Sequence, residues 1–287
     1  MTRIGFVGTE NSHVQHFIRF LNTEGRHSGV RAAALAGGQN DRNAELAETG
    51  EIDLIVDQPE ELIGKVDAAI VATRDGARHR AQAEPLLRAG MPVLVDKPLA
   101  TTVEDAQGLI DAAQAGSAML TSASALRFVP EITEFTSADR SALRHLHVVG
   151  PADPDSEYSG LFFYGIHHIE IALEILGNPE LEPGSITART VRDGDTTVAH
   201  CTIDGVQVTF TFVVPGSDGR VPFHATAVYT DQVRSHDLTL GGDYNAPALA
   251  HFIEAAQTGT APLTNGQLLA PVMVLAQIVA DLGGGAA

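Results

Sequence analysis

Residues 1–120 alternate short apolar runs with segments of helical period, and this alternation constrains the fold more than any other feature of the chain. The apolar runs predict six strands, Arg3–Gly8, Val30–Ala36, Asp53–Val56, Ala68–Thr73, Pro92–Val95 and Ala118–Thr121. Strands linked through helices run parallel, and most of these runs are too apolar to have a face in water. The pattern therefore predicts an α/β fold that begins with a Rossmann-like, doubly wound parallel sheet covered by helices on both faces.

The pattern changes near residue 124, where one helix is followed by consecutive strand runs. Asp204-Gly205 is a hairpin signal, and apolar residues alternate with polar ones from Val206 to Val214 after it. We predict two domains: a dinucleotide-binding domain over residues 1–123, and an α+β domain over residues 124–287. The second domain is expected to contain a mostly antiparallel open sheet and C-terminal helices.

Charge and cysteine content limit the classes of partner. Acidic residues outnumber basic ones by 36 to 18, which gives a formal charge of -18 at pH 7. Such a charge repels a phosphate backbone or an anionic lipid surface, so we expect neither nucleic acid nor membrane among the partners. No run reaches the roughly 18 apolar residues of a membrane span, no signal peptide is evident, and Cys201 is the single cysteine. We therefore expect a soluble, cytoplasmic protein.

The first strand ends in a glycine that leads directly into a helix, which is where a Rossmann domain binds the pyrophosphate of a dinucleotide. The turn reads Gly8-Thr9-Glu10-Asn11-Ser12-His13, so only the first of the three fingerprint glycines is present. Glu10 adds a negative charge near the expected phosphates. The turn is compatible either with a dinucleotide site or with an ordinary strand-to-helix connection.

The end of the second strand bears on the choice of cofactor. An acidic residue there would bind the ribose of NAD, but Ala36-Gly37-Gly38 occupies the place. Arg42, a few residues further on, could meet the 2'-phosphate of NADP. The cofactor is therefore expected to be NADP or NAD, with NADP preferred.

A lysine follows the fifth predicted strand. Val93, Leu94 and Val95 form a buried run whose carboxyl end leads into Asp96-Lys97-Pro98. Open α/β sheets bind ligands at this edge. The chain contains only two lysines, Lys65 and Lys97, beside 16 arginines, so a general preference for lysine does not explain Lys97. We predict that Lys97 is a functional residue.

These segments resemble the glucose-fructose oxidoreductase and inositol dehydrogenase family, Gfo/Idh/MocA. The resemblance is carried by Asp96-Lys97-Pro98, by Val71-Ala72-Thr73 followed by Arg74 and His79, and by Gly165-Ile166-His167-His168-Ile169-Glu170. It implies a Rossmann domain that binds NAD or NADP, and a second domain whose open sheet forms a homodimer or homotetramer interface. The implied activity is an NAD(P)-dependent oxidoreductase, in which hydride moves between the nicotinamide and a secondary alcohol or carbonyl of a small polar substrate such as a sugar or polyol.

The resemblance also implies residue roles. Lys97 and His167 would be catalytic, because a fixed ammonium stabilises alkoxide charge and an imidazole exchanges protons near neutral pH. The cofactor would contact Gly8, Thr9, Glu10, Asn11, Ser12, His13, Gly37, Arg42, Thr73, Arg74, His79, Asp96, Lys97 and Pro98. The substrate would contact Lys97, Tyr164, His167, His168 and Glu170. The two domains would enclose the substrate between Lys97 and His167.

One departure leaves alternatives open. Phe163 occupies the position of the family's aspartate, four residues before the histidine, so Tyr164, Tyr158 or Glu170 would have to support His167. A catalytically silent sensor that binds ligand or cofactor is one alternative function, and a dehydratase or isomerase is another. We expect no metal site, because His167, His168 and Glu170 have no second copy of their spacing elsewhere in the sequence.

Overall fold

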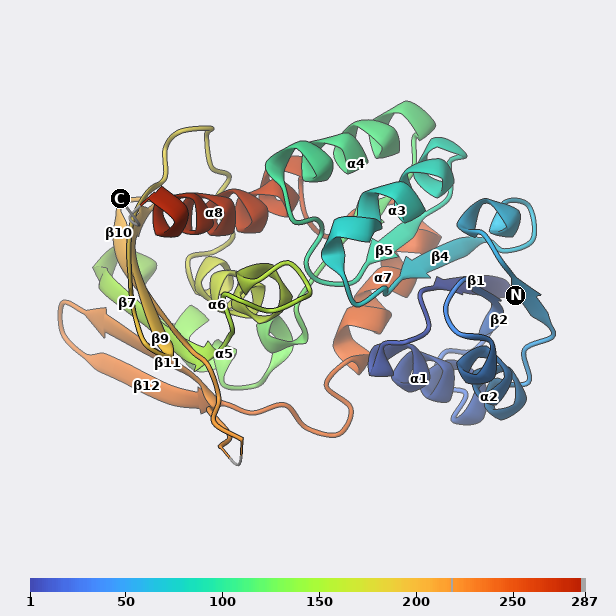
Figure 1. Cartoon of the computed structure of the whole chain (residues 1–287), viewed down its shortest axis with the longest axis horizontal. Coiled ribbons are helices and arrows are strands. Elements are labelled where there is room, and N and C mark those ends of the chain that lie inside the picture. The colour runs from blue at the N-terminus through green and yellow to red at the C-terminus, as the bar shows by residue number, and fades with distance from the viewer. Residues whose placement is uncertain (218, 285–287) are drawn as a thin grey trace. The chain divides into compact units, whose positions relative to one another are not determined.

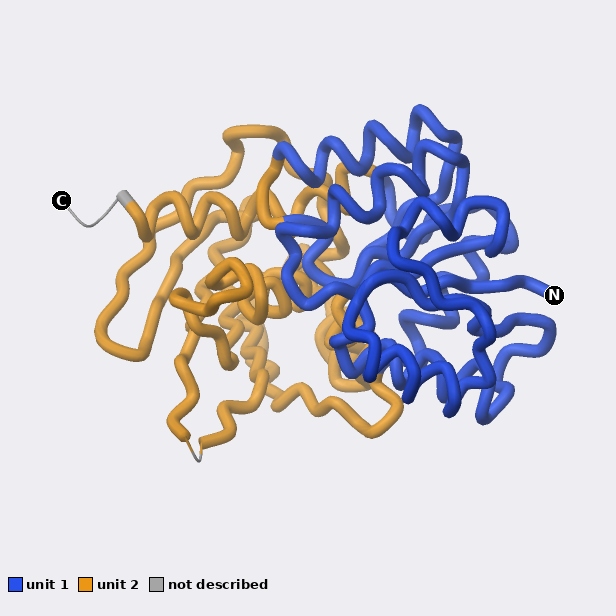
Figure 2. The backbone as a smooth tube through the Cα atoms, turned by 45° about the vertical axis from the view of Figure 1, so that its right-hand side comes forward, with its two compact units in different colours: residues 1–100, 104–123, 245–264 blue, residues 101–103, 124–244, 265–287 orange. Residues whose placement is uncertain are grey.

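The computed structural model describes residues 1–217 and 219–284. These residues form two compact units, coloured in Figure 2. Unit 1 consists of residues 1–100, 104–123 and 245–264, and unit 2 consists of residues 101–103, 124–244 and the chain from Asn265 onward.

The sheet of unit 1 has the six predicted strands. They are β1 (Thr2–Val7), β2 (Val30–Ala36), β3 (Leu54–Val56), β4 (Ala68–Val71), β5 (Val93–Val95) and β6 (Leu120–Thr121). All pairs are parallel and the order is β3-β2-β1-β4-β5-β6, so the chain reverses its winding between β1 and β4. This is the doubly wound arrangement, and its ligand crevice lies at the carboxyl ends of β1 and β4.

Helices cover the two faces of this sheet (Figure 1). They are α1 (Ser12–Ile18), which continues as a π-helical turn over Arg19–Thr23, α2 (Asn40–Gly50), α3 (His79–Arg88), α4 (Val103–Gly116) and α7 (Ala246–Thr258). Phe17 of α1 and Leu46 of α2 are buried in one apolar cluster with Phe6 of β1. Burial of these large side chains supplies most of the driving force for this layer.

The segment 245–264 belongs to unit 1, although the predicted boundary assigned everything after residue 123 to the second domain. Leu249, Phe252 and Ile253 of α7 are buried in the same apolar cluster as Phe6 and Phe17. A helix with this apolar stripe packs where a matching apolar face exists, and that face is provided by the N-terminal sheet. Sequence position alone does not indicate this return.

Unit 2 contains a six-stranded sheet. Its strands are β7 (Leu143–Pro151), β8 (Thr187–Asp193), β9 (Thr196–Ile203), β10 (Val206–Val213), β11 (Phe223–Tyr229) and β12 (Val233–Leu238). The order is β12-β11-β7-β10-β9-β8, and only β7 with β10 is parallel among its pairs. The predicted hairpin is present: Asp204 and Gly205 both have positive φ and join β9 to β10.

One face of this sheet is covered by helices and the other is open (Figure 1). The covering helices are α5 (Ile132–Thr136), α6 (Leu161–Ile175) and α8 (Asn265–Gly284). Buried Phe210 and Phe212 of β10 face these helices, while Thr209 and Thr211 alternate with them and lie on the open face. The predicted fold class, a Rossmann sheet followed by an α+β part, is confirmed.

The helix α8 is long and apolar enough to cross a membrane, judged by length and composition. An 18-residue window within Asn265–Gly283 has a mean hydropathy of 1.5. The expectation from the sequence concerned runs of consecutive apolar residues, and α8 meets the criterion through its mean hydropathy, since Pro271 lies inside the helix and does not end it. However, 44% of the window is buried against the rest of the protein, and the core helix of a soluble protein meets the same criteria.

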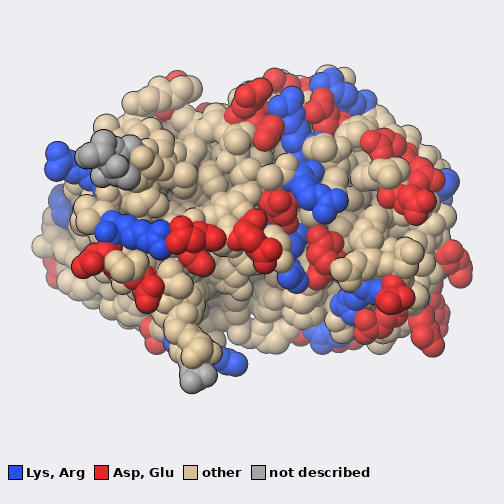
Figure 3. Space-filling view, in the orientation of Figure 1, with Lys and Arg blue, Asp and Glu red and all other residues tan. Residues whose placement is uncertain are grey.

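Charged side chains of both signs are interspersed over the face seen in Figure 3. The chain has 36 acidic and 18 basic residues, and on this face the acidic side chains stand in several separate groups. Such a surface disfavours non-specific binding to polyanions.

Candidate functional site

The turn after β1 is tight. Gly8 has φ of +77°, and a Cβ at this position would lie 2.6 Å from the backbone N and Cα of Thr73, which follows β4. Only glycine tolerates both the conformation and the close approach. The first fingerprint glycine therefore has a direct structural reason. Asn11, not Ser12, caps α1, because its side chain accepts a hydrogen bond from the amide of His13, and Ser12 is exposed.

The carboxylate of Glu10 has a partner. Glu10 Oε1 accepts a hydrogen bond from the backbone amide of Arg74 at 3.1 Å, and the Arg74 guanidinium donates to the Glu10 carbonyl at 3.1 Å. Both contacts direct Glu10 toward the loop after β4. The Glu10 carboxylate is thus held by a backbone amide of the loop after β4, and the residues of the turn remain compatible with a bound dinucleotide.

Thr9 is fully buried and connects the first turn to the second. Its hydroxyl donates to Asn43 Oδ1 at 2.5 Å, and Asn43 Nδ2 donates to the Gly37 carbonyl at 2.7 Å. Gly37 and Gly38 both have positive φ, as a tight turn after β2 requires. The side chain of Thr9 therefore fixes the second turn, and its direct contact with a cofactor would be limited to its backbone.

Arg42 is not directed to the end of β2 as a 2'-phosphate ligand would be. Its guanidinium forms an ion pair with Glu45 at 2.5 Å and donates to Gln15 Oε1 of α1 at 2.8 Å. Arg42, Gln15 and Glu45 line a small cavity between α1 and α2. The preference for NADP was drawn from the absence of an acidic residue at the end of β2, with Arg42 as the possible 2'-phosphate ligand, and the position of Arg42 does not support it.

Asp96 and Lys97 follow β5 at the carboxyl edge of the sheet. The Asp96 amide donates to the Val71 carbonyl at 2.7 Å, which extends the parallel ladder by one residue. Asp96 Oδ2 accepts from Asn11 Nδ2 at 3.1 Å and pairs with His13 Nδ1 at 2.8 Å. The lysine loop and the glycine turn are therefore joined by one carboxylate oxygen. Lys97 is 9% exposed, and its peptide bond to Pro98 is cis.

The electrostatics of Asp96 favour the ionised form. Burial alone would raise the pKa of Asp96, but the charge and hydrogen bond of His13, with the charges of Lys97 and His79, hold this pKa below its ordinary value. An ionised carboxylate accepts only, so His13 Nδ1 carries the hydrogen in this pair. His13 was predicted to contact cofactor, and its shown partner is Asp96.

His79 supports the lysine loop from behind. It is fully buried, and its ring nitrogens lie 2.8 Å from the carbonyl oxygens of Thr73 and Pro98. Carbonyl oxygens only accept, so both bonds form together only when both nitrogens carry hydrogen. The structure thus corrects the predicted cofactor contact of His79: both nitrogens bind backbone. Thr73 donates to Gln82 at 2.7 Å.

In unit 2, His167 lies in the middle of α6 and is 8% exposed. Its Nδ1 lies 2.6 Å from Ser124 Oγ, and its ring is edge-on to the rings of Tyr164 and Phe223 at 5.6 and 5.5 Å. Ser124 was not predicted. In the sequence near Ser124, the only feature that could point to a role is that Ser124 caps the short 3-10 turn Ala125–Phe128. Because Ser124 precedes His167 by 43 residues, no local pattern links the two. Of the partners considered from sequence, Tyr164 is in ring contact, and the Tyr158 ring lies tilted against Phe163 with centroids 4.9 Å apart.

Glu170 stands one turn after His167 on the same face of α6 and is 3% exposed. It accepts the backbone amide of Ser124 at 2.6 Å and lies 3.4 Å from Arg127, which also pairs with Glu174 at 2.9 Å. Arg127 additionally donates to Asn178. The predicted substrate contact of Glu170 is corrected by this burial, since its carboxylate is used to hold the segment around Ser124.

His168 is fully buried beneath the sheet. Its ring packs on Phe212 at 4.7 Å and on Phe223 at 5.2 Å, and neither ring nitrogen has a hydrogen-bond partner among the described residues. Burial lowers the pKa of His168 to about 4, although backbone groups of Gly150 and Tyr164 oppose the effect. His168 was predicted to contact substrate, and the structure places its side chain in the core between α6 and the sheet.

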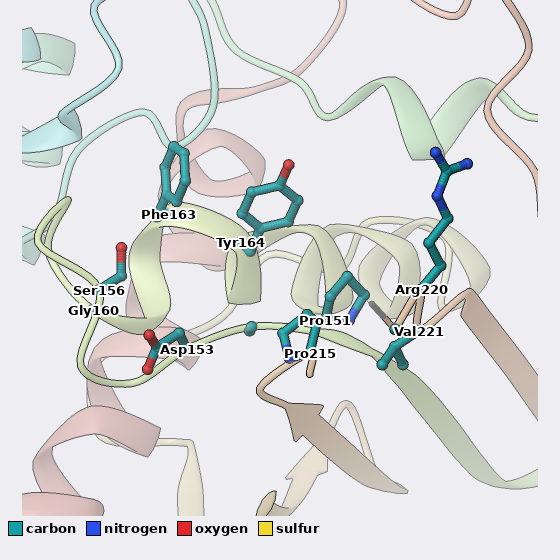
Figure 4. A pocket seen from close by; sticks show the side chains of 11 residues that line it. Pro151, Asp153, Ser156, Gly160, Phe163, Tyr164, Pro215, Arg220 and Val221 are labelled. Carbon is teal, nitrogen blue, oxygen red and sulfur yellow. The ribbon is translucent and has the colours of Figure 1, made fainter. Parts of the chain in front are cut away.

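A cavity of about 520 Å³ opens at the start of α6. In Figure 4, Phe163 and Tyr164 project from α6, with Pro151, Pro215 and Val221 on the opposite side. Asp153 and Ser156 lie at one end and Arg220 at the other. Phe163, at the position of the family's aspartate, therefore lies in the wall of this cavity. No group of three His, Cys, Asp or Glu with metal-binding geometry occurs among residues 1–217 and 219–284.

The doubly wound parallel sheet and the tight glycine turn define the class: a protein with a nucleotide-binding Rossmann domain. The profile described as "Oxidoreductase family, NAD-binding Rossmann fold", GFO_IDH_MocA, matches residues 2–124. Residues 2–124 therefore form a domain of the Gfo/Idh/MocA oxidoreductase family, as the sequence resemblance predicted.

Individual relatives agree with this assignment. The chain is 34% identical over 202 residues to inositol 2-dehydrogenase 2 of Saccharopolyspora erythraea, an alignment that covers 66% of this chain and 57% of that protein. It is 33% identical over 122 residues to 1,5-anhydro-D-fructose reductase of Ensifer adhaerens, over 42% and 35% of the two chains. The chain thus spans little more than half the length of the first of these relatives.

The fold has close structural counterparts. The crystal structure of GenD2 from gentamicin A biosynthesis, in complex with NAD, superimposes with a TM-score of 0.81 at 18% identity over 99% of this chain and 95% of that one. At this identity the similarity concerns the fold. It extends over both units, so the second unit has the architecture of its structural relatives although the profile ends at residue 124.

Proposed function

We propose that this protein is a nicotinamide-dependent oxidoreductase that interconverts a secondary alcohol and a carbonyl on a small polar substrate, a sugar or polyol. The observation that carries the proposal is the buried Asp96-Lys97 pair at the carboxyl edge of a Rossmann sheet, tied to the glycine turn by His13 and Asn11. A cation held at this edge stabilises negative charge on a reacting oxygen. The relatives named as inositol dehydrogenase and anhydrofructose reductase support the same substrate class.

The proposed cofactor is NAD. The residues of unit 1 fit a dinucleotide, because Gly8 keeps the turn tight and Arg74 engages Glu10. Arg42 is committed to Glu45 and Gln15, which removes the cation on which an NADP site at the end of β2 would depend. Bound NAD supplies the acceptor and donor of hydride. The glycine turn, Thr73 and the lysine loop would hold it at the sheet edge.

Lys97 contributes a fixed positive charge. Its ammonium would hydrogen-bond the substrate oxygen and stabilise that oxygen as it loses its proton. The adjacent Asp96 carboxylate, held by His13 and Asn11, keeps the backbone at Lys97 in place, and His79 holds the carbonyl of Pro98. A charge positioned in this way costs no reorganisation when the substrate reacts.

His167 would exchange the substrate's hydroxyl proton. Its Nδ1 is engaged by Ser124, so Nε2 is the nitrogen assigned to proton exchange. Imidazole is suited to this step because its ordinary pKa lies close to neutral pH.

The cavity at the start of α6 is the proposed substrate chamber of unit 2. Tyr164 connects it to His167, since its ring lines the cavity and contacts the imidazole. The aromatic rings of Phe163 and Tyr164 suit the C–H face of a sugar ring, and Asp153, Ser156 and Arg220 offer partners for hydroxyl groups. The aromatic and polar side chains that line this cavity therefore fit a substrate with both apolar and polar faces.

The test is a turnover assay of the purified protein with NAD and, separately, NADP across a panel of inositols, aldoses and glycosides. We expect reduced nicotinamide to accumulate with NAD and at least one polyol or sugar. Saturable cofactor binding without turnover of any substrate in the panel would contradict the oxidoreductase proposal.

That negative outcome would favour a silent sensor of the same fold. The specific observation in its favour is Phe163, which supplies neither charge nor a hydrogen bond to His167. A sensor should bind NAD with unchanged affinity in a His167→Ala variant, and sugars should alter its thermal stability without being consumed.

We also propose that two copies associate through the open face of the sheet in unit 2. Its central strands present uncharged side chains there, including Thr209 and Thr211 of β10 and Val149 of β7. Charged groups on this face, such as Arg189 and Asp237, stand on the outer strands β8 and β12. A face with a neutral centre and a charged rim has the anatomy of a protein interface. Sedimentation at micromolar concentration should show a dimer, and Val149→Arg should give a monomer, whereas Val279→Arg on α8 should not.

A further inference from the structure

Ser124 and His167 form a pair whose purpose the sequence motifs do not explain. They come from different elements of unit 2, both are buried, and the distance between Oγ and Nδ1 is 2.6 Å. A carboxylate is the usual partner of a proton-exchanging histidine. Here the position in the sequence where the family has its aspartate is Phe163, and a hydroxyl from a distant segment contacts the imidazole instead.

The hydroxyl of Ser124 is held from two sides. It accepts a hydrogen bond from the amide of Leu126 at 3.1 Å as the cap of the 3-10 turn. The amide of Ser124 in turn donates to Glu170 at 2.6 Å. Because His167 and Glu170 are one helical turn apart on α6, the helix binds the hydroxyl and the amide of the same serine. Ser124 therefore has little freedom to move away from the imidazole.

The group that contacts Nδ1 of His167 is a neutral hydroxyl, and the nearest carboxylate belongs to an ion pair. Glu170 is 3.4 Å from Arg127, and Arg127 pairs with Glu174, so the nearest carboxylate is committed to an ion pair. Tyr164 and Phe223 present their rings to the other sides of the imidazole, and His168 beside it on α6 points into the core. The contact to Nδ1 is thus made by a neutral donor and acceptor.

Proton exchange at Nε2 places a requirement on Nδ1. To accept a proton, Nε2 must first be unprotonated, and the neutral ring in that state carries its one hydrogen on Nδ1. When Nε2 donates a proton the ring is cationic, and Nδ1 again carries a hydrogen. An acceptor at Nδ1 serves both states, and Ser124 Oγ is placed to be that acceptor.

We propose that Ser124 is the positioning residue of His167: its hydroxyl fixes the ring and keeps the hydrogen on Nδ1, in place of the carboxylate that Phe163 removes. The proposal deepens the assignment of His167 and, as regards turnover, rests on the proposed function. A hydroxyl orients the imidazole without adding negative charge. His167 consequently loses its proton more readily than a carboxylate-paired histidine does.

The experiment follows His167 directly by NMR, in protein with isotope-labelled histidine and with His167→Gln for assignment. In the parent protein we expect the neutral ring to carry its hydrogen on Nδ1. Ser124→Ala should shift the ring toward the Nε2–H form. Ser124→Asp should retain Nδ1–H and raise the pKa of His167 by about one unit. An unchanged tautomer and pKa in both variants would overturn the proposal.

Turnover provides a second measurement. Ser124→Ala should lower kcat about 10- to 100-fold with KM little changed, because substrate contacts remain and only proton exchange is impaired. Ser124→Thr keeps a hydroxyl and the helix cap, so it should retain most of the activity. Such retention would show that the loss in Ser124→Ala is caused by the missing hydroxyl. Ser124→Asp should move the acid limb of the kcat/KM profile to higher pH. Ser185→Ala, at an exposed turn of unit 2, is the matched control.

The two measurements separate the two claims. If the NMR tautomer responds to Ser124 but no variant turns over any substrate, the positioning role stands and the proposed function fails. If turnover occurs in the parent protein but neither tautomer nor kcat responds to Ser124→Ala, the oxidoreductase assignment stands and the positioning role is wrong.

Discussion

The two units treat their histidines differently. In unit 1, His13 pairs with the Asp96 carboxylate, and His79 lies between two carbonyl oxygens. In unit 2, the buried His167 meets a serine hydroxyl and the buried His168 meets only aromatic rings among its described contacts.

The difference lies in what the partner can support. A carboxylate or carbonyl oxygen only accepts, so the imidazole nitrogen that faces it carries a hydrogen. A hydroxyl serves either form, and an aromatic pocket favours the neutral form. Unit 1 therefore surrounds Lys97 with imidazoles bound to oxygen acceptors, while unit 2 places its buried imidazoles beside a hydroxyl and aromatic rings. Four changes test this contrast.

Removing the fixed charge at Lys97 should have the greatest effect. Lys97→Ala should lower kcat with NAD by about 100- to 1,000-fold, as expected for loss of an electrostatic stabiliser of a developing oxyanion. Steady-state assays of nicotinamide reduction measure the loss. Lys65→Ala is a matched control, because it removes the only other lysine and Lys65 is exposed. Equal activity of both variants would mean that unit 1 contributes no catalytic charge.

Asp96→Asn should break the carboxylate–imidazole pair. Removing one partner of a buried ion pair typically costs about 3 kcal/mol, and we expect a comparable fall in the free energy of unfolding at pH 7. Because the pKa of Asp96 is depressed in the folded protein, its contribution is present above the ordinary carboxyl pKa of 3.8 and is lost as the pH falls below it. Chemical denaturation at pH 7 and pH 3 should show a large difference between parent and variant only at the higher pH.

The neutral histidine of unit 2 should also lower stability as the pH falls, but at higher pH than Asp96 does. The pKa of His168 is about 4 in the folded protein and its ordinary value is 6.5, so the unfolded chain takes up a proton between these values and the folded one does not. Stability should therefore fall by about 2 kcal/mol from pH 7 to pH 5 through His168 alone. His168→Leu should reduce this pH dependence in denaturation curves. An unchanged slope would show that His168 is protonated in the native state.

The open face of the sheet should give the smallest effect. Burial lowers the pKa of His145 and His147, and the charge of His200 adds to the shift in both. Burying neutral imidazoles in a dimer lowers these pKa values further, so the dimer should be stable at pH 7.5 and weaken as the pH falls through the lowered pKa values of the monomer. Sedimentation at pH 7.5 and 5.5 should show about a tenfold rise in the dimer Kd. His147→Gln should reduce that rise. A dimer Kd that does not change with pH would show that these imidazoles are not part of the interface.

Much of the fold could be predicted from local patterns. All six strands of unit 1 occur where apolar runs predicted them, and Asp204-Gly205 forms its hairpin, because strand periodicity and turn chemistry act over a few neighbouring residues. The lysine motif also lies at the predicted sheet edge. The return of α7 to unit 1 could not be predicted, since an apolar stripe does not indicate which face will cover it.

The candidate site was predictable in its residue types and less so in its contacts. Lys97 and His167 carry family motifs that can be read in the sequence. Arg42, His79, His168 and Glu170 were assigned to ligand, yet their side chains bind other parts of the protein. His79 and Glu170 are buried and use their polar atoms on neighbouring segments, His168 is enclosed by aromatic rings, and Arg42 pairs with Glu45 at the surface.

The order of amino acids specifies a Rossmann sheet, a lysine at its ligand-binding edge and a histidine helix, because each depends on periodicity and short motifs. The partners of the reactive groups arise on folding. His13 reaches Asp96 across 83 residues and Ser124 reaches His167 across 43, and such contacts depend on which elements pack together. Hydrogen bonds and charge pairs act over a few ångströms in space whatever the separation along the chain, so the charge state of each imidazole follows from packing.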